Sequence, residues 1–264
     1  MFEVIPYAAG LGLALVMALI AWLVSLPRRD VSHVDSLWSL FFLAMALVYL
    51  ALVSEPVARA YLVVALVAVW AVRLSAHITW RNWGHGEDRR YQAIRRHNDP
   101  GFAWKSLYLV FGLQAVLAWI ISLPLLGSIA SPRPLGWLDL AAVILWAAGF
   151  AFQVIGDRQL ARFKARPENQ GRVMDQGLWR YTRHPNYFGE AVIWWALYLL
   201  ALSAGAWWAI LSPVLMTFLL LRVSGVALLE RDIAERRPGY RDYIRRTNAL
   251  FPGPPRARPS PQDP

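Results

Sequence analysis

The sequence contains no cysteine. A disulfide framework, a thiol nucleophile, an iron–sulfur cluster and a zinc site with thiolate ligands are therefore excluded. Charged residues are also scarce, at 17% of the chain, against roughly 25% in an ordinary soluble domain. Neither G-x-G-x-x-G after a strand nor G-x-x-x-x-G-K-[ST] occurs, so any nucleotide has to be held by helix ends and arginines.

Apolar residues and basic residues are what the chain has in excess. Of its 264 residues, 57% are hydrophobic and 14 are tryptophan, and the formal net charge is +10. A chain that is apolar in bulk and basic at its edges is typical of a membrane protein with basic loops.

The apolar residues fall into runs that are long enough to span a bilayer. A spanning helix needs ~20 mostly apolar residues to cross about 30 Å of hydrocarbon. The runs that fit are 4–26, 34–53, 57–80, 102–126, 135–155, 187–202 and 204–221. The sequence therefore predicts an all-α, polytopic membrane protein of about seven transmembrane helices.

One membrane domain is expected over residues 1–251, with a C-terminal half from about residue 135. No repeat or long linker divides it. Residues 252–264 are rich in Pro, Arg and Ser and cannot bury enough apolar area to offset the entropy of ordering, so we expect a disordered tail.

The distribution of Lys and Arg predicts the orientation. With seven spans, one side of the membrane holds only Arg59 and Arg133, and the rest of the 27 basic residues fall on the other side. Because positive charge stays on the cytoplasmic side during insertion, the N-terminus is expected outside and the C-terminus in the cytoplasm. This rule explains the basic surface without a nucleic-acid partner. In a bacterium the membrane would be the inner membrane.

The densest group of polar and aromatic residues is GLWRYTRHPNYFGE, residues 177–190. Proline suits the first turn of a helix, so Pro185 predicts that the sixth span begins near residue 184. The free N–H groups and positive dipole end of that helix, with Arg180 and Arg183 just upstream, favour a phosphate or another anion. An interfacial anchor of Trp, Tyr and Arg is the alternative interpretation.

Charged residues at membrane depth require a partner or a function, because each costs at least about 2.5–3.5 kcal/mol. Glu190 lies one turn into the sixth span and shares a face with Asn186. Arg73 lies near the end of the third span and Arg222 ends the seventh. Both arginines could instead extend their heads to the interface.

A helix with one polar face is expected where the fifth span leaves the membrane. Gln153, Asp157, Leu160 and Lys164 recur at helical spacing, and Pro167 ends the helix. These polar residues indicate either a lined pocket or a solvated face. We also expect the ionic side chains of Asp157, Glu190 and Arg222 to converge on one anionic guest.

Two acidic groups lie at the predicted cytoplasmic interface, where a proton donor would be needed. Asp35 is just inside the second span, and Glu87 lies with Tyr91 in the loop GEDRRY, residues 86–91. A solvated, ion-paired turn is the alternative for that loop. The five histidines show no ligand spacing, so no metal site is expected.

The chain resembles the membrane-bound steroid 5-alpha-reductase family, specifically its poorly characterised bacterial branch. The resemblance rests on GLWRYTRHPNYFGE, the preceding DRQLARFK, the GEDRRY loop and LLERDIAERRPGYRDYIRRT, and covers about residues 30–252. It implies NADPH bound in a pocket open to the cytoplasm, and a lipophilic, steroid-like enone that enters from the membrane lipid. Hydride would reach the β-carbon while an acid polarises the carbonyl.

The resemblance also assigns residues. Positions that match the family's nucleotide pocket are Asp157, Lys164 (an arginine in the family), Asn186, Glu190 and Arg222. Our own interpretation of the helix mouth and its surroundings adds Arg73, Arg180, Tyr181, Arg183, His184 and Glu230 as cofactor-binding candidates. Asp35, Glu87 and Tyr91 are the candidates for the catalytic acid.

Two other functions stay open. Membrane methyltransferases of the isoprenylcysteine carboxyl and phospholipid N-methyltransferase kind share the RHPxY core and a late acidic residue like Glu230, which implies S-adenosylmethionine as the cofactor. A non-catalytic lipid-binding or scaffold protein would bind neither cofactor.

Overall fold

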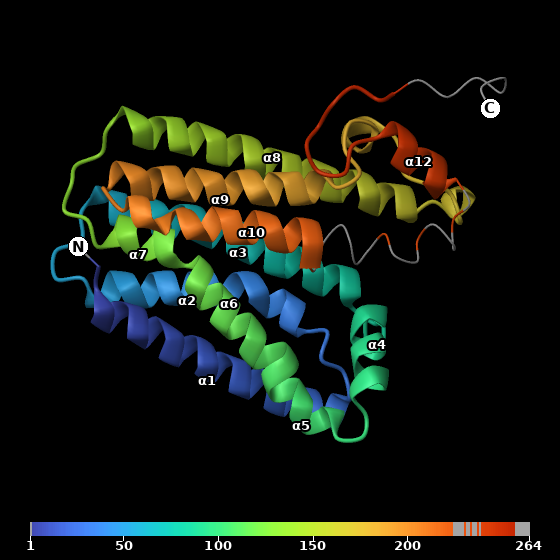
Figure 1. The fold of residues 1–264 in the computed structure, drawn as a ribbon, viewed down its shortest axis with the longest axis horizontal. Helices are drawn as coiled ribbons and strands as arrows, with labels where there is room; N and C mark the ends of the chain where they lie inside the picture. Colours follow the sequence, from blue (N-terminus) through green and yellow to red (C-terminus); the bar gives the residue numbers. More distant parts are fainter. Residues whose placement is uncertain (1, 224–229, 231–232, 234–236, 238, 257–264) are drawn as a thin grey trace. The chain divides into compact units, whose positions relative to one another are not determined.

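The computed structural model describes residues 2–223, 230, 233, 237 and 239–256 (Figure 1). These residues form helices and loops and no β-strand, and an isolated bridge pairs Thr182 with Asn248. The prediction of an all-α fold is confirmed. The helices are α1 (Val4–Arg28), α2 (Val34–Leu52), α3 (Ala58–Asn82), α4 (Arg89–Asn98), α5 (Phe102–Ser106), η1 (Leu107–Gly112), α6 (Leu113–Ile121), α7 (Leu123–Ile129), α8 (Trp137–Lys164), η2 (Pro167–Asn169), η3 (Gly177–Arg180), α9 (Pro185–Ser203), η4 (Trp207–Ile210), α10 (Leu211–Phe218), η5 (Leu219–Val223) and α12 (Tyr240–Arg246).

Within the described residues, five helical segments are long and apolar enough to cross a membrane. They are α1, α2, α3, the continuous run α5–η1–α6 and α8, and they match the first five predicted spans. α9 lies where the sixth span was expected, and its first two turns carry polar residues. The helical run Trp207–Val223, at the seventh, is apolar but shorter. Membrane embedding is thus supported, while the count of seven and the orientation stay predictions.

The chain divides into two compact units. Unit 1 comprises Met1–Asp139 and Leu200–Ser212, and unit 2 comprises Leu140–Leu199 and Pro213–Pro264. Unit 2 contains most of the C-terminal half that the sequence assigned to cofactor binding.

Unit 1 is built around α2, which packs against α1 and α3. Phe41, Phe42 and Tyr49 of α2 and Trp70 of α3 are fully buried. The Tyr49 ring packs directly on Gly10 of α1, where a Cβ would lie 2.7 Å from the ring. Large aromatic side chains on one helix and a missing side chain on the other let these helices approach closely.

A buried ion pair closes one end of unit 1. Arg59 is 1% exposed, and its guanidinium binds both carboxylate oxygens of Asp139, each at 2.9 Å. The same guanidinium donates to the carbonyls of Arg133 and Pro134, each at 2.8 Å. The sequence placed Arg59 with Arg133 on the sparsely charged side of the membrane, but Arg59 is an interior residue because this set of acceptors satisfies its donors.

Unit 2 is built on close packing of α8 and α9. A Cβ on Gly189 of α9 would lie 2.5 Å from the carbonyl oxygen of Gly149 and 2.6 Å from the amide nitrogen of Gln153, both on α8. Gly156 of α8 likewise contacts Pro185. Because small residues allow backbones to touch, side chains on either side of these glycines are brought within hydrogen-bonding distance.

The chain after residue 251 differs from the expected loose tail over its first five residues. The Gly253 amide donates to the Tyr181 carbonyl at 3.0 Å, and the Arg256 amide donates to the Arg246 carbonyl at 2.9 Å. This stretch is ordered by backbone hydrogen bonds and not by burial of apolar side chains. Residues 257–264 lie outside the described part of the chain.

Candidate functional site

Two pairs of polar side chains join α8 and α9 in unit 2. The Gln153 amide donates to one carboxylate oxygen of Glu190, and Trp194 donates to the other at 3.2 Å. One turn along, the Asn186 amide donates to Asp157 at 3.1 Å. Gln153, Asp157 and Glu190 are each 6% exposed or less, so α8 contributes a buried polar face and not a solvated one.

The polar face is not fully satisfied. The Oε1 atom of Gln153 is buried and has no hydrogen-bond partner among the described residues. A buried amide oxygen without a partner costs about 1–3 kcal/mol, so a donor from a ligand or an ordered water is the expected occupant of that position.

α9, at the position of the predicted sixth span, begins at the residue that the proline predicted. α9 starts at Pro185, and the Phe188 amide donates to the His184 carbonyl at 3.0 Å. Proline supplies the backbone angle of the first turn at a position where an N–H is not needed.

Glu230 is the centre of a second cluster, which includes the two residues that precede α9. Arg183 donates to its two oxygens at 2.7 and 2.9 Å. One of these oxygens also contacts His184 Nε2 at 2.9 Å and accepts from the Tyr240 hydroxyl at 3.2 Å. The RHP sequence and the late acidic residue, 46 or 47 positions apart in the chain, therefore form one ionic group.

The electrostatics of this cluster favour a charged Glu230. Burial raises the pKa of Glu230, but hydrogen bonds from His184 and Arg183 outweigh it and bring the pKa from 4.5 to about 2. Burial lowers the pKa of Arg183, and the bonds to Glu230 raise it above its ordinary value. Burial and the Glu230 charge raise the pKa of Tyr240, which stays a neutral donor.

Arg183 differs in role from the expected anion ligand. Besides Glu230, it donates to the backbone carbonyls of Ile244 and Thr247, at the end of α12. With 8% of the residue exposed and these bonds made, its charge is neutralised inside the protein. The prediction that Arg183 offers free positive charge at the helix mouth is therefore wrong.

α12 is fixed to the segment before α9 by further hydrogen bonds. The Tyr243 hydroxyl donates to the Trp179 carbonyl, and the Thr182 hydroxyl donates to the Leu250 carbonyl at 2.8 Å. α12 carries two tyrosines, Tyr240 and Tyr243. In the structure both tyrosines are buried against the site. Residues 224–229 lie outside the described part of the chain.

The other predicted cofactor residues of unit 2 are exposed. Arg180 and Tyr181 are exposed just before α9, and Lys164 is exposed at the end of α8. Arg222 is exposed at the end of η5. The expected convergence of Asp157, Glu190 and Arg222 is thus reduced to the two carboxylates on α8 and α9, because a long arginine at a helix end extends its head outward.

Arg73 belongs to unit 1. It is a half-buried residue of α3, whose side chain is held within the protein.

The acidic candidates of unit 1 form their own network. Asp35, in the first turn of α2, accepts from the Tyr91 hydroxyl and from Arg90, each at 2.6 Å. Gln114 donates to the Tyr91 hydroxyl at 3.1 Å. Burial and the Asp35 charge raise the pKa of Tyr91 well above its ordinary value. The structure thus brings Asp35 and Tyr91 together.

Glu87 is engaged elsewhere. Arg95 binds both of its oxygens, at 2.6 and 2.9 Å, and the Val31 amide donates to it at 3.1 Å. This is the ion-paired turn that the sequence offered as the alternative, so the structure speaks against Glu87 as a proton donor.

Several site residues escaped the sequence reasoning. Trp194 follows Glu190 by four positions on one helix face, and this spacing could have identified it. Arg246 and Asp175 carry no local signal, because they meet only through folding of distant segments.

Comparison with known proteins assigns the chain to a family. The family described as "Protein of unknown function (DUF1295)" matches residues 21–247. The chain belongs to this family. The DUF1295 match covers both polar clusters of unit 2 and the Asp35–Tyr91 network.

A relative of this DUF1295 chain occurs in the yeast Schizosaccharomyces pombe (strain 972 / ATCC 24843). It is described as "Uncharacterized protein C594.04c" and is 26% identical over 285 residues, which cover 94% of this chain and 80% of the yeast protein. No solved structure matches the chain.

Proposed function

We propose that this chain is a membrane oxidoreductase that uses NADPH to reduce a carbon–carbon double bond in a lipophilic enone, such as a steroid-like molecule. The proposal rests on the resemblance to the steroid 5-alpha-reductase family, on membership of DUF1295 and on the geometry of unit 2.

One observation carries the proposal. Asp157, Asn186 and Glu190 match three positions of the reductase family's nucleotide pocket, and in unit 2 they line one buried α8–α9 interface. Lys164 and Arg222, the other matching positions, are exposed on the surface of unit 2.

The donors and acceptors present suit a nucleotide. Carboxylates of Asp157 and Glu190 would accept from ribose hydroxyls or an amide, and the Gln153 Oε1 atom offers a buried acceptor that the described residues leave unused. The N-terminal end of α9 adds a positive dipole for a phosphate. NADPH, when bound, supplies the hydride that adds to the β-carbon of the enone.

The proton for the α-carbon and the polarisation of the carbonyl require an acid. Tyr91 is our candidate, with Asp35 as its positioning partner, because burial and the Asp35 charge raise the pKa of Tyr91 and keep its hydroxyl protonated. To polarise the carbonyl, that hydroxyl would exchange its hydrogen bond to Asp35 for one to the substrate oxygen.

A second function is favoured by a different observation. The RHP sequence and the late acidic residue, which membrane methyltransferases share, are joined by the contacts of Arg183 and His184 with Glu230. A methyltransferase that uses S-adenosylmethionine is therefore the alternative proposal.

Ligand-induced thermal stabilisation of the full chain in neutral detergent separates these proposals. We expect NADPH to raise the unfolding midpoint and S-adenosylmethionine to leave it unchanged. Glu190→Gln should weaken the apparent NADPH affinity by roughly tenfold or more, since a hydrogen bond to a charged group contributes about 1.5–3 kcal/mol. Glu168→Gln, at an exposed carboxylate of the same unit, is the matched control.

Stabilisation by S-adenosylmethionine alone would replace the reductase proposal by the methyltransferase. No response to either cofactor would leave a lipid-binding or scaffold role. Equal effects of Glu190→Gln and Glu168→Gln would contradict the assigned pocket even if NADPH binds.

A further inference from the structure

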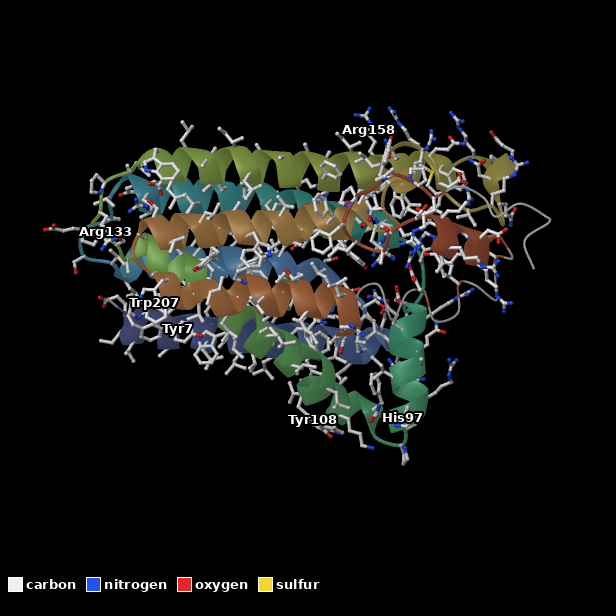
Figure 2. The ribbon with its side chains drawn as sticks, turned by 45° about the horizontal axis from the view of Figure 1, so that its top comes forward. Tyr7, His97, Tyr108, Arg133, Arg158 and Trp207 are labelled. Carbon is white, nitrogen blue, oxygen red and sulfur yellow. The ribbon has the colours of Figure 1, made fainter. Side chains whose placement is uncertain are left out.

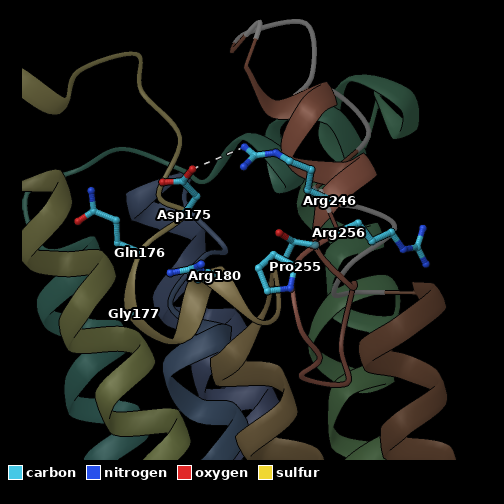
Figure 3. A pocket seen from close by; sticks show the side chains of 8 residues that line it. Asp175, Gln176, Gly177, Arg180, Arg246, Pro255 and Arg256 are labelled. Carbon is cyan, nitrogen blue, oxygen red and sulfur yellow. Dashed lines mark ion pairs between the residues drawn. The ribbon is translucent and has the colours of Figure 1, made fainter. Parts of the chain in front are cut away.

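A basic pocket of about 510 Å³ lies in unit 2, lined by η3, the end of α12 and the segment that follows it (Figure 3). Its charged lining residues are Arg180, Arg246, Arg256 and Asp175. Three guanidinium groups thus share one pocket with one carboxylate. The volume lies within the range of about 300–1,000 Å³ that is usual for small-ligand sites.

Arg246 has hydrogen-bonding capacity that the described residues leave unused. Its Nη2 atom lies 3.7 Å from Asp175 Oδ2, which is an ion pair too long for a hydrogen bond. Its Nε atom is buried and has no hydrogen-bond partner among the described residues. A half-buried guanidinium in this state is an unsatisfied donor set, and an oxyanion is the group that satisfies it best.

Arg180 supplies a second cation, for which the described residues provide no ion-pair partner. It is exposed on η3, and in Figure 3 it lies beside the Asp175–Arg246 pair, whereas the head of Arg256 extends away from that pair. Gly177, with φ +59°, also lines the pocket. Because glycine has no side chain, backbone atoms form that part of the pocket wall.

The neighbouring Arg183 differs from Arg180 and Arg246 in its bonding. Four of its hydrogen bonds go to Glu230 and to two backbone carbonyls, so its charge is neutralised inside the protein. The positive charge that the motif places before α9 is therefore available at Arg180 and not at Arg183, and Arg246 of α12 adds a second guanidinium to the pocket lining.

We propose that Arg180 and Arg246 form a binding site for a phosphate monoester. Guanidinium forks match the geometry of phosphate oxygens and bind a dianion with charge-assisted hydrogen bonds. The phosphate would displace the loose contact of Asp175 and satisfy the buried Nε donor of Arg246. Two sources offer this chemistry: the 2′-phosphate of a nucleotide and the headgroup of phosphatidic acid.

The first test uses inorganic phosphate on the full chain in neutral detergent, with chloride at equal ionic strength as the reference. Phosphate should raise the unfolding midpoint in a saturable way. Arg180→Ala should weaken the apparent phosphate affinity roughly 10- to 100-fold, while Arg158→Ala should change it less than about twofold. Arg158 is exposed on α8 (Figure 2), and it is not among the residues that line the pocket.

Two further variants guard against misfolding as the cause. Arg246→Lys keeps the positive charge beside Asp175 but loses the fork, so phosphate affinity should fall and the midpoint without phosphate should hold. Asp175→Asn removes the competing carboxylate, and phosphate should then bind more tightly. A merely structural cluster would not give this gain in affinity.

Adenosine 2′-monophosphate against adenosine, and phosphatidic acid against phosphatidylcholine in mixed micelles, separate the two sources. The source is the phosphate ligand whose stabilisation exceeds that of inorganic phosphate and is lost in Arg180→Ala. No saturable response to any phosphate ligand, or equal effects of Arg180→Ala and Arg158→Ala, would overturn the site. A chain that binds phosphate here but not NADPH would refute the proposed reductase and leave this inference intact.

Discussion

Replacing Glu230 by glutamine tests the ionic cluster directly. The carboxylate of Glu230 is shared by Arg183, His184 and Tyr240, and the amide of glutamine cannot accept from all of them with a negative charge. Arg183, at 8% exposure, would be left without its counter-ion. We expect a loss of stability at neutral pH and a weaker dependence of stability on pH.

The magnitude follows from the pKa. A fall from 4.5 to about 2 corresponds to about 3 kcal/mol at 1.36 kcal/mol per pKa unit. Partial exposure of the Glu230 side chain, 14%, admits solvent and reduces this to about 2 kcal/mol. Because the folded pKa is depressed, this stability is present above pH 4.5 and is lost as the pH falls toward about 2.

The assay is the unfolding midpoint of wild type and Glu230→Gln in neutral detergent from pH 7 to pH 3. At pH 7 the variant should unfold about 4–8 °C lower, and the difference should shrink between pH 5 and pH 3. Glu168→Gln, at an exposed carboxylate, should follow wild type throughout. A difference between wild type and Glu230→Gln that stays constant over this range would refute the assignment of Glu230 as the buried anion.

Three other substitutions test the packing and the unit 1 networks. Arg59→Met should lower the free energy of unfolding by about 3–5 kcal/mol, because it leaves the buried Asp139 without its counter-ion. The double variant Arg59→Met with Asp139→Leu should recover most of this loss in the unfolding midpoint. A double variant that is no more stable than Arg59→Met would contradict the ion pair. Gly189→Ala should destabilise by at least about 1–3 kcal/mol since backbone atoms block its Cβ, whereas Gly12→Ala, with open space around it, should show no such loss. Tyr91→Phe should abolish reduction of enones in an NADPH-oxidation assay but leave the NADPH-induced thermal shift unchanged, and full turnover in this variant would remove Tyr91 as the acid.

Local signals in the sequence located the helices of the site well. Pro185 fixed the start of α9, and Pro167 correctly limited α8, which ends at Lys164. The helical spacing of Gln153 and Asp157 identified the buried face of α8. Such features depend on backbone preferences and periodicity, which a short window of sequence contains.

The pairing of charges was not predictable in the same way. Arg183 and Arg180 look alike in the motif, yet one is neutralised by Glu230, 47 residues later, and the other is exposed. Nor did any local pattern show that Arg59 is buried and Arg222 exposed. Whether a cation is ion-paired depends on which distant acceptors the fold brings close to it. A local sequence pattern does not contain that information.

The hydrogen bond from the Arg256 amide to the Arg246 carbonyl bears on how the protein can be handled. A polypeptide that ends at Leu250 would keep every helix described here but would lose the backbone segment that borders the basic pocket. Affinity tags are therefore better attached after Pro264 than in place of residues 251–256, and binding data from a form that lacks these residues would underestimate the affinity for anions.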